Sequence, residues 1–512
     1  MKHAGLTLSA VALLAFSPVA AMADDVTISN SEGSFRVTGE IISFDNSTLT
    51  IKTAVGQLTI DRANLICEGD DCPVVDDQFQ MKVAVTDESL ESLFQGMMSG
   101  FAEQKQLVAL SVPNANGRIA RIGLASDMSE VDTENGAELV LGGPDVGFGQ
   151  LSQRQVDLVL SAQDVPESAL QSIGDRESLE QVVALDAIIP VVNPNNDIRS
   201  ISIEEIALVA AGRIRNWAEL GGPNATIRFI LPEAGSSLDT ATNELILEPN
   251  RARIRRTAER ADSVSEAVQA VMNDPFAMTL AGLPDVDSSR VVPIRQSCGP
   301  LANATDLSVK AEEYPLTRRV YLYGSEERYA GLEGEFMDYV MSQAAQPLVE
   351  AAGYVDQTIL SVPFGNQSTR MTSAVLSARS AQDLGLVRAF AEDMVNAERV
   401  STSFRFRSGS SLLDARSIDD IGRMVDFLNS EDARGREIVV VGFTDDVGRL
   451  DLNTRLGQQR AQNVTQSLLA APGGSGLAER VSVVSYGPVA PIGCNDTPVG
   501  RETNRRVEIW LR

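Results

Sequence analysis

Hydrophobic and polar positions alternate over short distances in the first part of the chain. Between residues 24 and 75, β-branched and apolar runs are separated by polar turns. The runs are residues 26–28, 35–42, 48–53 and 57–60. This pattern is typical of short strands joined by tight turns. We therefore expect a small all-β unit, a meander or small open barrel, that acts as a spacer or interaction module.

From residue 76 the pattern changes to apolar runs that alternate with segments of helical period. The predicted strands are 81–85, 156–161 and 187–192, and the predicted helices are 90–104 and 203–210. Strands that alternate with helices are typical of a parallel sheet whose ligand loops follow the carboxyl ends of the strands. We expect an α/β domain over residues 76–356.

Residues 357–400 differ from the segments on either side. They begin with a mixture of Pro, Gly, Asn, Gln and Ser, and the apolar spacing predicts a helix over 374–396. Its apolar face consists of Leu384, Leu386, Val387, Phe390 and Met394. Two Arg and no Lys are too few for membrane adsorption, so this face indicates packing on a neighbouring domain. We expect a linker and helix here, followed by an α/β sandwich over 401–512.

The first 23 residues have the pattern of a secretory signal peptide. Lys2 precedes an apolar run at 10–15, and Ala21 and Ala23 are the small residues expected before a cleavage site. The run is too short to span a bilayer, and no later stretch is long and apolar enough. The residue directly after the cleavage site is not Cys, so we expect no lipoprotein anchor. The mature chain should reach an oxidising periplasm without a transmembrane segment.

Composition narrows the classes of function. The 512 residues carry a net charge of −27, and residues 401–512 contain 14 Arg and 14 Asp or Glu, so the excess acid lies upstream. Such a surface is unsuited to nucleic acid or anionic lipid. The single histidine, His3, leaves with the signal peptide, which excludes His-dependent catalysis and His-ligated zinc. We expect no enzyme, no metal and no cofactor.

The four cysteines fall into two groups. Cys67 and Cys72 bracket a short acidic turn, and we expect them to form a local disulfide in an oxidising compartment. Cys298 and Cys494 are distant in sequence, and the sequence leaves open whether they meet. If they do, they join two domains.

A candidate binding site follows the apolar run at 437–441, which predicts a buried strand. Asp445 comes after this strand, and Arg460 lies on the helix predicted over 452–469. A Gly-containing turn joins the two elements, so the carboxylate and the guanidinium can converge on one ligand that carries an ammonium and a carboxylate. A zwitterionic amino acid fits this description. The alternative is a structural ion pair.

The same stretch resembles the outer-membrane protein A-like (OmpA-like) peptidoglycan-binding domain. The shared elements are Gly442-Phe443-Thr444-Asp445, Asn453, Arg460-Ala461 and Asn504-Arg505-Arg506-Val507-Glu508. The resemblance implies that Asp445 and Arg460 hold the diaminopimelate of the cell-wall peptide, and that Thr444, Asn453, Asn504 and Arg505 belong to the same site. Gly457 stands where the family usually has Ser, and we expect it to loosen the start of the helix.

A second resemblance is to the periplasmic phosphate-binding proteins of ABC importers. It is carried by Gly212-Arg213-Ile214-Arg215-Asn216-Trp217 with Glu219-Leu220-Gly221-Gly222, by Asp186, and by Tyr314 to Arg319. It covers roughly residues 78–355 and implies a two-lobed, type II-like binding-protein fold. In that family a small anion lies between the lobes, held by hydroxyls and by N–H groups at helix N-termini.

This second resemblance assigns a ligand cleft to three loops. It implies Ser89 in the first lobe, Asp157 as the acceptor for a protonated oxyanion, and the loop Gly235-Ser236-Ser237 in the second lobe.

The same loops depart from the family pattern. Leu238 occupies the position of the family's Thr, and Pro232 occupies the position of its Arg. Asp87 and Glu88 add negative charge beside the first helix. Three alternatives remain for the cleft: a different small ligand, phosphate held more weakly, or loss of ligand binding in favour of a scaffold role.

Together these patterns predict a cell-wall-tethered solute-binding protein in the periplasm of a Gram-negative bacterium, associated with the outer membrane. The implied partners are peptidoglycan, a small anionic ligand such as phosphate, and an ABC importer or another envelope protein. The alternative is a ligand-free scaffold that links peptidoglycan to the outer membrane or to another envelope protein.

Overall fold

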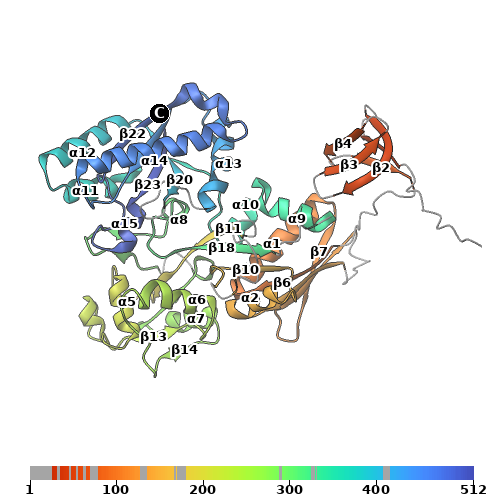
Figure 1. The fold of residues 1–512 in the computed structure, drawn as a ribbon. Helices are drawn as coiled ribbons and strands as arrows, with labels where there is room; N and C mark the ends of the chain where they lie inside the picture. The colour runs from red at the N-terminus through yellow and green to blue at the C-terminus, as the bar shows by residue number, and fades with distance from the viewer. Residues whose placement is uncertain are drawn as a thin grey trace, which may run out of the picture. The chain divides into compact units, whose positions relative to one another are not determined.

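The computed structural model describes residues 26–30, 35–44, 48–53, 56–61, 65–69, 79–126, 135–166, 169, 180–286, 291–324, 329, 331–406 and 415–512 (Figure 1). The predicted signal peptide lies outside these residues. The chain divides into two compact units, Met1–Asp77 with Tyr329–Glu335, and Gln78–Arg328 with Phe336–Arg512. Among the described helices, none combines the length and apolar character needed to cross a membrane.

The first unit contains an antiparallel sheet with the strand order β4-β3-β2-β1-β5. Its strands are β1 (Val26–Asn30), β2 (Arg36–Phe44), β3 (Thr48–Thr53), β4 (Gly56–Asp61) and β5 (Leu65–Glu68). Strands β1 to β4 form a meander, and β5 returns to pair with β1. Alternate residues face a small core of Val26, Ile28, Leu49 and Ile51, as a period of two requires.

The second unit begins with a lobe built on a mixed sheet of order β11-β18-β10-β6-β9-β8-β7. Its strands are β6 (Gln80–Val85), β7 (Val108–Pro113), β8 (Ile119–Ala125), β9 (Gly136–Leu141), β10 (Leu158–Ser161), β11 (Glu180–Ala187) and β18 (Thr317–Gly324). In this sheet the predicted parallel arrangement is limited to β6 with β9 and β10. The other described pairs are antiparallel, because β7 and β8 form a hairpin and β18 runs back from the second lobe.

The strand predicted over 187–192 is divided between two sheets. Strand β11 ends at Ala187, and β12 (Ile189–Val192) begins a second sheet of order β12-β15-β13-β14. The Ile188 N–H donates a hydrogen bond to Leu316 O at 2.9 Å, so the outgoing chain and the returning chain before β18 meet at this crossing. Periodicity along the chain does not reveal this change, because both halves of the run are buried and apolar.

The second lobe carries the segment that resembles the binding-protein family. Its other strands and its helices are β13 (Arg228–Leu231), β14 (Glu259–Arg260), β15 (Ala277–Ala281), α5 (Ile203–Ala210), α6 (Ser237–Thr242) and α7 (Val264–Asn273). Helix α5 begins with a capping box, in which Ser202 and Glu205 satisfy each other's backbone N–H groups. The Trp217 ring is fully buried and donates to Phe276 O at 3.0 Å. The segment is therefore part of the core of this lobe.

The C-terminal domain has a sheet of order β19-β20-β23-β21-β22 between two layers of helices (Figure 1). The strands are β19 (Ser361–Pro363), β20 (Glu398–Arg405), β21 (Ile438–Phe443), β22 (Val481–Gly487) and β23 (Arg506–Leu511). Ile438 and Val440 face the helices α13 (Ala415–Asn429) and α14 (Leu450–Ala470). Val439 and Val441 face the opposite layer. Strand β21 is thus covered on both sides, which explains its continuous apolar run.

The segment predicted as a linker and helix is part of this C-terminal domain. It contributes the edge strand β19 and the helices α11 (Ser368–Ser377) and α12 (Ala381–Met394). Val387, Phe390 and Met394 of the predicted apolar face are buried against the sheet, whereas Leu384 is largely exposed.

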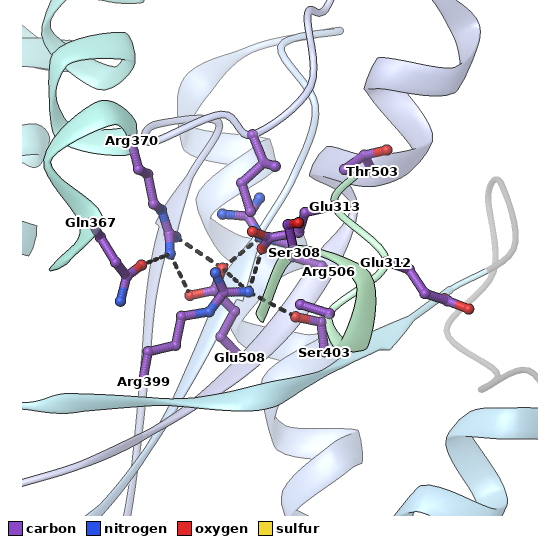
Figure 2. A network of polar contacts seen from close by, with 12 residues as sticks. Ser308, Glu312, Glu313, Gln367, Arg370, Arg399, Ser403, Thr503, Arg506 and Glu508 are labelled. Atoms are coloured by element: carbon purple, nitrogen blue, oxygen red, sulfur yellow. Dashed lines mark hydrogen bonds and ion pairs between the residues drawn. The ribbon is translucent and has the colours of Figure 1, made fainter. Parts of the chain in front are cut away.

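A buried cluster of charged side chains lies within this domain (Figure 2). Glu508 on β23 is fully buried and accepts from Arg370 at 3.0 Å and from Arg506 at 2.6 Å. The guanidinium of Arg399 is 3.5 Å from Glu508 and also pairs with Glu313. Burial alone would raise the pKa of Glu508, but the three guanidiniums outweigh it and hold the pKa well below its usual value.

A second set of ion pairs joins the lobes to the C-terminal domain. The carboxylate of Glu312 is 2.6 Å from Arg319 of β18 and 2.5 Å from Arg416 of α13. Burial opposes ionisation of Glu312, but these arginines together with Arg405 lower its pKa well below the usual value. Ion pairs of Glu312 with arginines from both sides therefore hold the junction.

A disulfide between Cys298 and Cys494 adds a covalent link at the same junction. It connects residues 196 apart in sequence, which answers the question that the sequence leaves open. Hydrogen bonds from Ser297 to Asp496 and from Gln296 to Ile492 O, at 2.9 and 3.2 Å, lie next to it. Cys67 is also disulfide-bonded. Its predicted partner Cys72 lies outside the described residues, so that pairing stays a prediction.

Candidate functional site

The predicted wall-binding residues lie where β21 ends and α14 begins. Helix α14 packs directly on the strand: a Cβ added to Gly442 would lie 2.0 Å from Gly457 O. A Cβ added to Gly457 would lie 2.3 Å from the Ser485 hydroxyl. The predicted loosening at Gly457 is therefore wrong: α14 is continuous from Leu450 to Ala470, and glycine is what allows this close approach.

Asp445 and Arg460 belong to one charged site at this position. The Asp445 Oδ2 atom is 3.0 Å from Arg505 Nη1, and Oδ1 accepts the Val447 N–H at 3.0 Å. The Arg460 side chain is 1% exposed, and its guanidinium lies 5.1 Å from the centre of the Phe406 ring. Burial and the charge of Arg505 lower the pKa of Arg460, while Asp445 acts in the opposite direction.

Two further predicted residues, Asn453 and Thr444, lie next to this site and order its backbone. The Asn453 amide donates to Asp445 O and to Val447 O, both at 3.2 Å, which orders the loop before α14. Thr444 is 3% exposed, and its N–H donates to Gly487 O at 2.9 Å. The Thr444 hydroxyl makes no hydrogen bond to any described residue.

Asn504 has a different role from the one that the resemblance implies. Its side chain is fully buried, with its oxygen accepting from the N–H groups of Ile492 and Gly493 at 2.8 and 3.1 Å. Its nitrogen donates to Gly493 O at 2.8 Å. Asn504 thus orders the loop that carries Cys494. Its amide is not available to a ligand, and it contributes to the site only by fixing the backbone next to Arg505.

Chemically, this site combines two guanidiniums with one carboxylate. A carboxylate of a ligand can pair with the guanidiniums, and an ammonium can pair with Asp445, so the arrangement suits a zwitterion.

A second candidate site is the cleft between the two lobes. It contains a cavity of about 230 Å³ whose lining includes Asp87, Ser89, Asp285 and Arg318. Arg318 at the start of β18 is bound to Asp186 at the end of β11, with Nε and Nη2 each 2.7 Å from Oδ2. Burial alone would lower the pKa of Arg318, but the charges of Asp186 and Asp87 raise it. This pair stands where the chain crosses between the lobes.

Asp87 reaches from the first lobe towards the second. Its carboxyl faces the hydroxyl and N–H groups of Ser237, the first residue of α6. Burial raises the pKa of Asp87, and the charge of Arg318 and the donors of Ser237 oppose this shift. The lobes also touch directly, since a Cβ added to Gly143 would lie 2.7 Å from Gly235 O.

The predicted cleft residues separate into two groups. Ser89 lines the cavity and hydrogen-bonds with the Tyr354 hydroxyl at 3.0 Å, and Ser237 accepts from Arg318 at 3.2 Å. Ser236 instead caps α6, because its hydroxyl accepts the Asp239 N–H at 3.2 Å and donates to Glu233 O at 2.8 Å. Gly235 donates its N–H to Asp239 at 3.0 Å.

The prediction that Asp157 contacts the ligand is wrong. Asp157 is exposed and precedes β10, and it accepts the Lys82 N–H at 2.7 Å. It therefore lies at the amino end of the strand, whereas the cleft is at the carboxyl end of the neighbouring β6. The acidic residue that follows β10 is Asp164, which hydrogen-bonds with the Tyr323 hydroxyl at 3.0 Å.

The sequence reasoning did not assign Asp186, Asp285, Arg318 or Tyr354 to the cleft. A signal exists for the pair Asp186 and Arg318, because each is a charged residue beside an apolar strand. Asp285 and Tyr354 have no such signal, since they come from turns that only the tertiary structure brings to the cleft.

Comparisons with known proteins agree with this division of the chain. A family model described as a PBP superfamily domain matches residues 74–344, and a model of the OmpA family matches residues 405–505. The phosphate-binding protein PstS of Borreliella burgdorferi is 22% identical over 218 residues, which cover 42% of this chain and 77% of that protein. The peptidoglycan-binding protein ArfA of Mycobacterium tuberculosis is 39% identical over 103 residues, which cover 20% of this chain and 29% of that protein.

Among solved structures, the crystal structure of an ABC-type phosphate transport receptor from Vibrio cholerae aligns with a TM-score of 0.41 and 18% identity. The alignment covers 54% of this chain and 99% of that chain. The two family models match the two regions that contain the sites described above. The chain therefore belongs to the PBP superfamily, whose model spans more than half of its residues, and its C-terminal part is an OmpA-family domain.

Proposed function

We propose that this protein is a periplasmic solute-binding protein that is held on the cell wall. Its C-terminal domain binds peptidoglycan non-covalently, and its two-lobed domain receives a small ligand. The names of relatives support both halves, since PstS is a phosphate-binding protein and ArfA is a peptidoglycan-binding protein. The role is binding rather than catalysis, because both matched families are families of binding proteins.

The observation that carries the proposal is the charged site formed by Asp445, Arg460 and Arg505. Arg460 is almost fully buried, yet it shares this site with a second guanidinium that lowers its pKa. Such an arrangement gains stability when a carboxylate enters. A diaminopimelate residue supplies that carboxylate and an ammonium for Asp445.

Co-sedimentation with purified diaminopimelate-containing peptidoglycan tests the wall-binding role. Asp445→Ala and Arg460→Ala each remove a charge-assisted contact of about 1.5–3 kcal/mol, so we expect wall affinity to fall by at least roughly tenfold. Arg455→Ala is the matched control, because Arg455 lies on the same helix and pairs with Asp451 in solvent. If all three variants sediment like the parent protein, the assignment of the site is wrong.

One observation favours the scaffold alternative for the lobes. Asp87 faces donors of Ser237 that a bound anion would otherwise use. On this alternative, the lobes stay closed without ligand and link the wall to the outer membrane or another envelope protein, such as an importer. A saturable rise in melting temperature with any small ligand would exclude the scaffold alternative, because stabilisation by mass action requires binding to the folded state.

A further inference from the structure

The cleft holds more negative charge than its arginine can balance. Asp87, Glu88 and Asp285 line the cavity, and Arg318 is the one guanidinium among the described lining residues. The charge of Arg318 is already matched by the fully buried Asp186, 2.7 Å away. Asp87 and Asp285 therefore face the cavity without a cation of their own among the described residues.

The pKa values of Asp87 and Asp285 are both raised, as burial together with an excess of negative charge predicts. Burial, followed by the charge of Asp186, raises the pKa of Asp285 to about 7. Burial also raises the pKa of Asp87. In addition, the Asp87 Oδ2 atom is shielded from solvent and makes no hydrogen bond to the described part of the chain. A buried carboxylate oxygen without a donor is costly, so a ligand that brings a donor to the Asp87 Oδ2 atom is favoured.

The groups that would hold an oxyanion are already engaged. The Ser236 hydroxyl caps α6, and the Ser237 hydroxyl accepts from Arg318. Leu238 offers no hydroxyl, and the N–H of Ser237 faces the carboxyl of Asp87. A phosphate would have to displace these contacts and approach Asp87, Glu88 and Asp285, whose ionised forms oppose it by charge repulsion.

The remainder of the cavity is apolar or neutral. Leu238, Val264, Pro284 and Ala352 line it together with Ser89, Ser92 and Ser265. Its volume of about 230 Å³ is below the range typical of drug-sized ligands, so the ligand is small. No group of three metal-ligating side chains suited to a metal ion occurs among the described residues. An organic cation thus fits this lining better than a metal ion.

We propose that the interlobe cleft binds a small organic amine, with its ammonium between Asp87 and Asp285 and its carbon chain against Leu238 and Val264. This inference rests on the proposed solute-binding function and names its ligand class. The ammonium supplies a cation for the two carboxyls and a hydrogen-bond donor for the Asp87 Oδ2 atom. Because one carboxyl belongs to each side of the cleft's lining, the amine also stabilises the closed arrangement of the lobes.

Thermal-shift titration of the full chain at pH 8 with putrescine, lysine, inorganic phosphate and calcium tests this proposal. We expect a saturable rise in melting temperature with putrescine or lysine, and no saturable rise with phosphate or calcium. Asp87→Asn and Asp285→Asn should each weaken amine binding by at least tenfold. Asp157→Asn, an exposed acid outside the cleft, is the matched control and should bind amines like the parent.

Proton linkage sharpens the test. Asp285 faces Asp186 on β11, Arg318 on β18, Asp87 before α1 and the Gly282 N–H in its own turn. An ammonium favours the ionised carboxyl, so amine affinity should rise roughly tenfold from pH 6 to pH 8 in the parent. This rise should be absent in Asp285→Asn.

The outcomes separate the inference from the proposed function. A saturable shift with phosphate or calcium but with neither amine overturns the amine assignment while solute binding stands. No shift with any of the four probes, or equal amine binding by Asp87→Asn and Asp157→Asn, also overturns it. Failure of the same protein to sediment with peptidoglycan counts against the wall-binding role alone.

Discussion

The charge cluster around Glu508 and the interlobe cleft use the same residue types in opposite proportions. Glu508 is surrounded by Arg370, Arg399 and Arg506, and together with Glu313 the cluster holds three guanidiniums and two carboxylates, so each of its buried carboxylates has a cation (Figure 2). In the cleft, Arg318 is matched by Asp186, and Asp87 and Asp285 remain. A buried carboxylate that is paired with guanidiniums is costly to remove and needs no ligand to balance its charge. A buried site with an excess of one charge is stabilised when a ligand of the opposite charge binds.

The wall-binding site, like the Glu508 cluster, holds more guanidiniums than carboxylates. Its two guanidiniums, Arg460 and Arg505, share one carboxylate, Asp445. It is therefore short of one negative charge, whereas the cleft is short of positive charge. The comparison teaches that the sign of the imbalance, rather than the number of charged residues, determines what each site can bind.

The largest expected effect comes from breaking the Glu508 cluster. Glu508→Gln leaves three buried guanidiniums without their central carboxylate, and we expect the C-terminal domain to lose about 3–5 kcal/mol of stability. Urea unfolding followed by Trp510 fluorescence measures this loss. The control Glu437→Gln removes an exposed pair with Arg512 and should cost only about 0–1 kcal/mol. Similar small losses in both variants would show that the cluster is not a stabilising element.

The next effect concerns the covalent link between the two regions. Replacing both Cys298 and Cys494 by Ser opens a loop of 196 residues, and we expect a loss of about 2–4 kcal/mol. Calorimetry should then resolve separate transitions for the lobes and the C-terminal domain. Ser297→Ala, which removes only the neighbouring hydrogen bond to Asp496, is the control. A double variant that melts like the parent would mean that the ion pairs of Glu312 suffice to couple the domains.

The smallest expected effect is a difference in how the stability of the lobes and of the C-terminal domain depends on pH in the absence of ligand. The pKa of Asp285 is raised to about 7, so between pH 4 and 7 the folded state holds a proton that the unfolded chain has released. The stability of the lobes should therefore fall by about 1–3 kcal/mol as pH rises from 5 to 8. The pKa of Glu508 is lowered, so its contribution is constant over that range and is lost only as pH falls below about 4.5.

Asp285→Asn should reduce this pH dependence of the lobes, leaving the part that comes from the raised pKa of Asp87, and should leave the C-terminal domain unchanged. Domain-resolved melting temperatures at pH 5, 6, 7 and 8 provide the measurement, with Asp157→Asn as the control. A slope that is unchanged in Asp285→Asn would assign the buried proton to another group.

The two candidate sites also differ in how far the sequence could predict them. The wall site is built mainly from a strand, a turn and a helix that are consecutive, so Asp445, Asn453 and Arg460 are recognisable by their spacing. Arg505 joins them because β23 pairs with β21, which the motif near residue 504 already suggests. The roles of Asn504 and Gly457 were misjudged, because both depend on contacts with distant backbone.

The cleft was predicted less well for a physical reason. Asp186 and Arg318 are separated by 132 residues and meet only because the chain crosses between the lobes twice. Asp157 was assigned to the cleft by the resemblance to the phosphate-binding proteins, and the sequence does not show at which end of the sheet it lies. The departures from the family pattern at Asp87 and Leu238 are visible in the sequence. The interaction of the Asp87 carboxyl with the hydroxyl and N–H of Ser237 is visible only in the structure.

By itself, the sequence determined the β-rich first segment, the α/β character of the remainder, the position of the wall-binding motif and the absence of histidine chemistry in the predicted mature chain. These features follow from local periodicity and residue type, which need no knowledge of distant contacts. Only the tertiary structure decided that residues 357–400 complete the C-terminal sheet, that Cys298 meets Cys494, and that the cleft lacks positive charge. Each of these depends on which distant segments are brought together, because burial and charge balance are properties of the folded neighbourhood.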